Sequence, residues 1–149
     1  MTVLGALLLL AAEQSTDAFL DSPPVDWVTA HAPYGMDVTL DGKVWINTNR
    51  TGAKDDYAIL ANDLYKAVTG RSSNPRLWIR GYHFRNRAVT YRETKILVSI
   101  DCLRDTIWVE RKLFYAAGGE LLASTGPFGT EPIVPGSIGE TWRDAACAS

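Results

Sequence analysis

The chain has 149 residues, of which 46% are hydrophobic and 21% charged, and its formal net charge at pH 7 is −2. This length favours one domain with a hydrophobic core of its own, and the near-neutral charge excludes a protein that binds polyanions through bulk charge. Five Trp, six Tyr and four Phe favour strands over helices as the dominant element.

An uncharged apolar run, VLGALLLLAA, begins at Val3. It is shorter than the roughly 20 residues that a membrane-spanning helix needs, but it has the length of a signal-peptide hydrophobic region. TDA, residues 16–18, is an A-x-A-like cleavage site, and cleavage after Ala12 is an alternative. The segment before the run has no Lys or Arg, so a buried N-terminal element of a cytosolic protein is the competing interpretation. We predict a signal peptide over residues 1–18, one exported domain over residues 24–149, and no membrane span.

Runs rich in β-branched and aromatic residues predict strands along the rest of the chain. In chain order they are Val25–Ala32, Met36–Leu40, Lys43–Asn47, Arg76–Phe84, Ile96–Cys102, Thr106–Tyr115 and Glu120–Ala123. Asp41-Gly42 is a two-residue hairpin turn between the second and third runs. In the run Thr106–Tyr115, strict alternation would place four apolar side chains on one face: Ile107, Val109, Leu113 and Tyr115. Arg111 would interrupt this apolar face. The stretch at 124–132, STGPFGTEP, is expected to be a loop.

Two segments have helical character. Over Asp55–Val68, apolar residues recur at helical spacing, and Asp55 and Gly70 suit the two helix ends. The alternative there is a strand through Tyr57–Leu60 followed by a loop.

The second helix is expected at the C-terminus. Ser137 is an N-cap candidate, and Glu140 would complete a capping box. Ile138, Trp142 and Ala145 or Ala146 form one apolar stripe. A helix this short is marginal in isolation, so it must dock on the sheet.

The chain has two cysteines, Cys102 at the end of a predicted strand and Cys147 at the end of the last helix. A bond between them would close a loop of about 46 residues, fit an exported domain, and stabilise it by roughly 4 kcal/mol. Two buried free thiols are the alternative. Two cysteines at this spacing with two distant histidines match no zinc pattern.

The segment from Arg71 to Lys95 carries a local charge of +6 interleaved with aromatic residues. Even-numbered residues of the strand Arg76–Phe84 share one face, which would suit a polyanion. The alternative is that the aromatics belong to the core and the arginines are solvated or paired with acidic residues. The candidate binding residues are Arg76, Trp78, Arg80, Tyr82, Arg85, Arg87 and Arg92.

The sequence contains few residues that could form a catalytic site. His31 and His83 are the two histidines, and His83 among strand aromatics suggests a structural, hydrogen-bonded side chain. Ser137 is not in a G-x-S-x-G motif, and no phosphate-binding loop is present. We therefore expect no enzyme activity, no catalytic residue, no cofactor and no metal.

Two stretches together resemble the bacterial surface-adhesin protein E-like family: ETKILVSIDCLRDTIWVERKLFYAAGGELLAS and IVPGSIGETWRDAAC. RLWIRGYHF is similar to the Trp-bearing strand that precedes them in the family, so the resemblance covers about residues 76–147. It implies an exported protein, a mostly antiparallel sheet packed on helix, and pairing of Cys102 with Cys147. The member that gives the family its name adheres to host matrix and serum proteins.

The sequence thus predicts an α+β fold: a mostly antiparallel sheet of about five to six strands, with a C-terminal helix and an inserted helix packed on it. We expect an exported, non-catalytic binding domain of the bacterial periplasm or cell surface, engaging an anionic partner through its basic-aromatic strand. That partner would be a host or envelope protein or an acidic polysaccharide, and not nucleic acid. A structural envelope domain without a ligand is the alternative, and an enzyme of unrecognised type is a more remote one.

Overall fold

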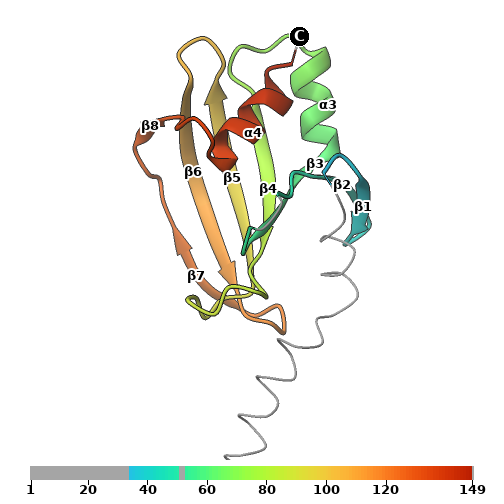
Figure 1. Ribbon diagram of the computed structural model, residues 1–149, viewed down its shortest axis with the longest axis vertical. Coiled ribbons are helices and arrows are strands. Elements are labelled where there is room, and N and C mark those ends of the chain that lie inside the picture. Colours follow the sequence, from blue (N-terminus) through green and yellow to red (C-terminus); the bar gives the residue numbers. More distant parts are fainter. Residues whose placement is uncertain (1–33, 51–52, 149) are drawn as a thin grey trace, which may run out of the picture.

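A computed structural model describes residues 34–50 and 53–148. The predicted signal peptide, the predicted strand Val25–Ala32 and His31 lie outside the described residues. The described part is an α+β structure, dominated by one antiparallel sheet with two helices on it (Figure 1). The predicted fold class is therefore confirmed.

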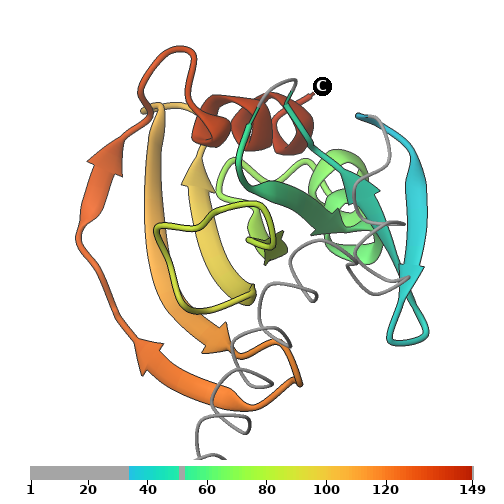
Figure 2. The same cartoon turned by 60° about the horizontal axis from the view of Figure 1, so that its bottom comes forward.

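Within residues 34–50 and 53–148 the sheet has eight strands, more than the expected five to six. They are β1 Asp37–Leu40, β2 Lys43–Asn47, β3 Asp56–Leu60, β4 Arg76–Tyr82, β5 Glu93–Asp101, β6 Thr106–Tyr115, β7 Leu121–Thr125 and β8 Thr130–Pro132. Neighbours in sequence are neighbours in the sheet from β1 to β7. β7 and β8 both pair with β6, one after the other along its outer edge (Figure 2).

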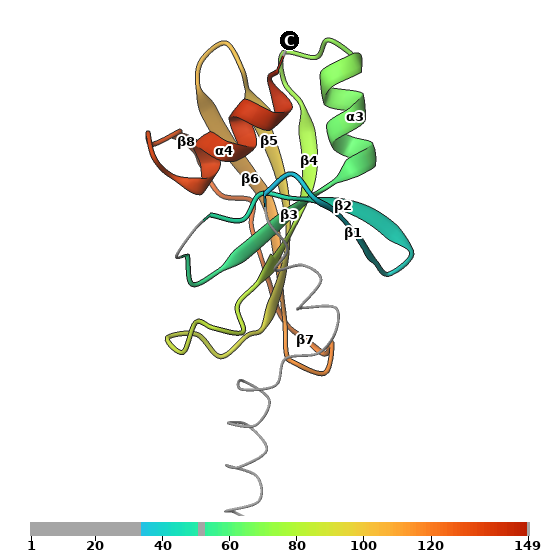
Figure 3. The ribbon, with the colours of Figure 1, turned by 45° about the vertical axis from the view of Figure 1, so that its right-hand side comes forward.

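The two helices, α3 Ala61–Thr69 and α4 Ile138–Ala146, pack on the same face of the sheet (Figure 3). The core on that face joins the helices to the interior strands, and its buried members are Ile59, Ala67, Leu77, Ile79, Ile96, Val98, Ile100, Trp142 and Ala146. A second buried cluster contains Val38, Leu40, Trp45, Ala58, Tyr82 and Phe84. Because interior strands bury side chains on both faces, the sheet separates the two clusters.

The predicted hairpin is confirmed. Asp41 and Gly42 have φ values of 50° and 70°, the left-handed conformations that a tight turn between twisted antiparallel strands requires. The turn sets the register, in which Val38 lies opposite Trp45. Trp45 is consequently buried, whereas its neighbour Val44 is exposed.

The predicted helix over Asp55–Val68 is wrong in its first part. Residues from Asp56 to Leu60 form β3, which pairs with β2 on one side and β4 on the other, and the helix begins only at Ala61. The alternative that we considered, a strand through Tyr57–Leu60, is correct, although a helix and not a loop follows it. Alternate residues of this run face opposite cores, so sheet pairing overrides the helical spacing.

The predicted face of Thr106–Tyr115 is also wrong, because a β-bulge interrupts β6. Val98 lies opposite Val109, whereas the preceding Leu97 lies opposite Arg111, so Glu110 is an extra residue. One inserted residue reverses the alternation of side chains. Ile107 and Val109 therefore face the helices, while Leu113 and Tyr115 do not share their face.

The loop expected over 124–132 contains the end of β7 and the three-residue strand β8. Phe128 and Trp108 hold this segment against β6: the Phe128 amide donates to the carbonyl of Val109, and the Trp108 indole donates to the carbonyl of Phe128 over 2.7 Å. Local sequence carries little signal for so short an edge strand, because its pairing depends on β6.

Helix α4 has the predicted N-cap. The Ser137 hydroxyl accepts the amide of Glu140, while the Ser137 amide donates to the carbonyl of Val134, so one half of the expected capping box is formed. The helix buries Trp142 and Ala146. Cys147 forms its C-cap and is bonded to Cys102, which follows β5. The predicted disulfide is confirmed.

Candidate functional site

Arg80 lies at the centre of the predicted basic-aromatic strand, and it is only 5% exposed. Its Nε donates to Glu93 over 2.6 Å, and its Nη1 lies 2.9 Å from Asp41. The guanidinium also lies over the rings of Trp45 and Tyr82. Burial lowers its pKa, but the hydrogen bond to Glu93 and the electrostatic interactions with Tyr82, Glu93 and Asp41 together outweigh burial, and the net shift is upward. Arg80 is therefore a buried, paired cation.

Arg76 occupies the exposed start of the same strand. Its Nε donates over 2.8 Å to Glu110, the bulge residue of β6, and Ser99 donates to the same carboxylate oxygen. The hydrogen bond from Arg76 lowers the pKa of Glu110. Glu110 thus presents its carboxylate on the face opposite the helices, where it meets both Arg76 and Ser99.

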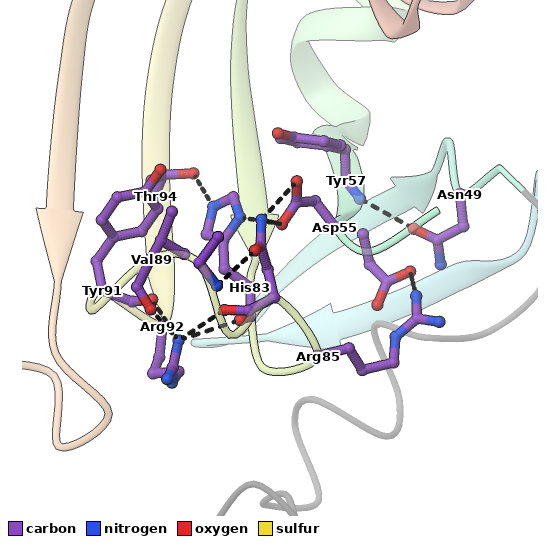
Figure 4. A network of polar contacts seen from close by, with 12 residues as sticks. Asn49, Asp55, Tyr57, His83, Arg85, Val89, Tyr91, Arg92 and Thr94 are labelled. Carbon is purple, nitrogen blue, oxygen red and sulfur yellow. Dashed lines mark hydrogen bonds and ion pairs between the residues drawn. The ribbon is translucent and has the colours of Figure 1, made fainter. Parts of the chain in front are cut away.

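The other three predicted arginines lie in the connection between β4 and β5, and Figure 4 shows Arg85 and Arg92 there. Arg85 donates to buried Asp56 over 2.8 Å. Arg92 directs its Nη1 at four backbone carbonyls, the shortest contact being 2.8 Å to Val89, and therefore holds the connection together. Arg87 is exposed.

The two predicted aromatic candidates share the β4 face opposite the helices with Arg80. Tyr82 is buried and packs in the second core cluster, while Trp78 is half-buried at the cluster's edge. The structure thus brings the strand residues onto one face, but acidic side chains pair with Arg76, Arg80 and Arg85. A binding role for this set stays a prediction.

A groove opens beside Trp78 on this face, and we call it the aromatic groove. Its volume is about 490 Å³, and it is lined by Asp41, Lys43, Trp45, Leu60, Trp78 and Lys95. Volumes of about 300–1,000 Å³ are typical of small-molecule sites. Within the described residues, neither lysine forms an ion pair with a carboxylate, although the Lys95 ammonium lies 5.1 Å from the centre of the Tyr115 ring.

Sequence reasoning missed Lys43, Trp45 and Lys95 as site residues. Part of the information was present in the sequence, because the Asp41-Gly42 turn fixes the register of the hairpin and so places Lys43 and Trp45 on one face of β2. What was missing was β3, whose Leu60 lies opposite Trp45 and joins the hairpin to β4. A helix over that segment would leave no strand between β2 and β4, and Trp45 would then not lie near Trp78.

A second polar cluster is centred on His83 (Figure 4). His83 Nδ1 lies 2.8 Å from Asp55, and Nε2 lies 2.8 Å from the hydroxyl of Thr94. A carboxylate only accepts hydrogen bonds, so Nδ1 carries the proton and Nε2 accepts from Thr94. Burial lowers the pKa of His83, partly opposed by Asp55. Burial likewise raises the pKa of neighbouring Tyr57, with Asp55 and Asp56 adding to the shift.

This order of hydroxyl, imidazole and carboxylate has the connectivity of a catalytic triad, but its burial argues for a structural role. Thr94 is 0% and His83 2% exposed, so a substrate has no direct path to the hydroxyl. The cluster is packed closely: a Cβ on Gly81 would lie 2.4 Å from the Thr94 hydroxyl. The prediction of a hydrogen-bonded structural histidine agrees with these contacts.

Among the described residues, no group of three or more His, Cys, Asp or Glu side chains is placed to hold a metal ion. No helix in that part of the chain is long and apolar enough to cross a bilayer. Comparison with known proteins finds no family model, no curated protein and no solved structure that matches the chain.

Proposed function

We propose that the protein is an exported, non-catalytic binding domain that holds an anionic partner in the aromatic groove. The observation that carries the proposal is the pairing of two tryptophans with two lysines that have no carboxylate partner among the described residues. A charge without a counter-ion beside an aromatic wall is available to a ligand.

Export is supported by two independent features. The disulfide Cys102–Cys147 is a bond that persists in oxidising compartments and is rare in the reducing cytoplasm. The apolar run from Val3 has signal-peptide length. Fractionation of the producing cell, with sequencing of the mature N-terminus, tests this part: a protein that begins after residue 18 or 12 supports it, and an uncleaved cytoplasmic protein contradicts it.

The ligand-binding part is tested by replacing lysines. Substituting Arg80 or Arg85 would break an ion pair in which one partner is buried, so an effect on binding could not be separated from an effect on folding. The informative variant is therefore Lys43→Gln/Lys95→Gln. We expect the wild type to be retained on immobilised heparin, with retention that falls as salt rises, and the variant to elute at lower salt. Lys54→Gln/Lys66→Gln removes the same charge from exposed positions outside the groove and should elute like the wild type. Equal elution of all three proteins would contradict the proposal.

A structural envelope domain without a ligand is a second candidate, favoured by the internal ion pairs of Arg76, Arg80 and Arg85. It predicts no retention on heparin at physiological salt. The adhesin-type role implied by the family resemblance belongs with the first candidate, and the same experiment separates the two.

A further inference from the structure

We infer that the ligand of the aromatic groove is an acidic saccharide, one sugar ring of which lies against Trp78 while its acidic groups meet Lys43 and Lys95. This inference rests on the proposed function and names the class of partner for the same site. Its basis is the arrangement of the groove across four adjacent strands.

The strand registers place the apolar side chains of the groove in one row. Trp45 of β2 lies opposite Leu60 of β3, and Trp78 of β4 lies opposite Leu97 of β5. Leu60 and Trp78 are the next residues beyond the last β3–β4 pair, Ile59 with Ile79, so the row continues across the sheet. Adjacent strands are about 4.8 Å apart, which puts the backbones of the two tryptophans roughly 10 Å apart, with Leu60 as the floor between them.

The two lysines stand on opposite sides of this row. Lys43 precedes Trp45 by two residues on β2, and Lys95 precedes Leu97 by two residues on β5. β2 and β5 run in opposite directions, because each pairing from β2 to β5 is antiparallel. Residues two apart share a face, so one cation lies on each side of the aromatic row. A ligand lying across the row would meet a positive charge at both of its edges.

The negative charge in the groove is already compensated. Asp41 lines the groove, but its carboxylate lies 2.9 Å from the Arg80 guanidinium. Glu93 is likewise bound to Arg80. Lys43 and Lys95 therefore set the charge that a ligand meets, which favours an anionic ligand over a neutral or cationic one.

The row favours a saccharide over an acidic peptide, because it offers side chains and almost no backbone. Peptides commonly bind by adding a strand to a sheet edge, whereas β2 to β5 each have a neighbour on both sides. The Trp78 amide is occupied as well, since it donates to Asp63 over 2.8 Å. Flat indole faces suit the flat, apolar C–H face of a sugar ring, and an indole N–H suits its hydroxyls.

Calorimetric titration of the mature protein with matched probes tests the inference. The probes are tetragalacturonate, its neutral methyl ester, a heparin-derived tetrasaccharide and a capped tetraglutamate peptide. We expect at least one acidic tetrasaccharide to bind, and the methyl ester and the peptide to bind at least about tenfold more weakly. Trp78→Leu keeps an apolar side chain at this position but lacks the flat face, and should weaken saccharide binding about fivefold.

The control variants are Tyr65→Ala on α3, an exposed aromatic outside the groove, and Lys54→Gln/Lys66→Gln; both should bind like the wild type. If the peptide binds as tightly as the saccharides, with loss in Lys43→Gln/Lys95→Gln but not in Trp78→Leu, the saccharide inference is wrong and the proposed function stands. If no acidic probe binds, both are wrong. If binding is unchanged in every groove variant, the groove is not the site.

Discussion

Removing the disulfide should destabilise the protein by about 4 kcal/mol in the double variant Cys102→Ser/Cys147→Ser. The two cysteines are separated by 45 residues, and the chain-entropy model gives about 4 kcal/mol for a crosslink closing a loop of that length. This is a large part of the about 5–15 kcal/mol that stabilises a typical domain. The bond also anchors α4, which has nine residues and would be marginal in isolation.

Urea unfolding at 25 °C, followed by circular dichroism, measures the global effect. Amide hydrogen exchange measures the local effect. If the helix loosens first, the exchange rates of α4 should increase more than those of β4 and β5. Wild-type protein reduced with dithiothreitol is the matched control, and it should unfold with the double variant. A loss below about 1 kcal/mol would refute this reasoning, because it would mean that packing of Trp142 and Ala146 suffices to hold the helix.

The remaining predictions concern the His83 cluster and the α4 cap. Gly81→Ala should cost about 1–3 kcal/mol, because its Cβ would meet buried Thr94; a variant as stable as the wild type in urea would contradict the packing described. His83 has a lowered pKa in the fold, so its contribution to the free energy of unfolding is complete above the unfolded pKa of about 6.5 and declines as the pH falls from there to the folded pKa. Urea titrations from pH 7.5 to 5 should show this decline in the wild type and a smaller one in His83→Gln. The same pH dependence in both proteins would count against this role of His83. Ser137→Ala should cost about 1 kcal/mol, since its hydroxyl caps the Glu140 amide, whereas Ser124→Ala, an exposed control, should leave the thermal midpoint unchanged.

Sequence patterns were sufficient wherever the structure is decided by neighbouring residues. Asp41-Gly42 specifies a tight turn because few residues adopt left-handed conformations there. Ser137 caps α4 because its hydroxyl reaches an amide three residues on. Most strand positions followed from composition in the same way, as did the need of a short terminal helix for a tether, which Cys147 and Cys102 provide.

The groove and its charge depended on contacts between residues far apart in the chain. Helical spacing over Asp55–Val68 concealed β3, since the sheet that stabilises β3 is built from β2 and β4. The bulge at Glu110 reversed which of the later residues of β6 face the helices, and nothing local marks an inserted residue.

By itself the sequence determined the Asp41-Gly42 turn, the Ser137 cap and most of the strands, because those choices are made within a few residues. The tertiary structure alone decided that Arg80 is paired with Asp41 and Glu93, while Lys43 and Lys95 stand free of carboxylates among the described residues. The physical reason is that a charge is neutralised by whatever lies within a few ångströms of it, and that distance is set by strand register.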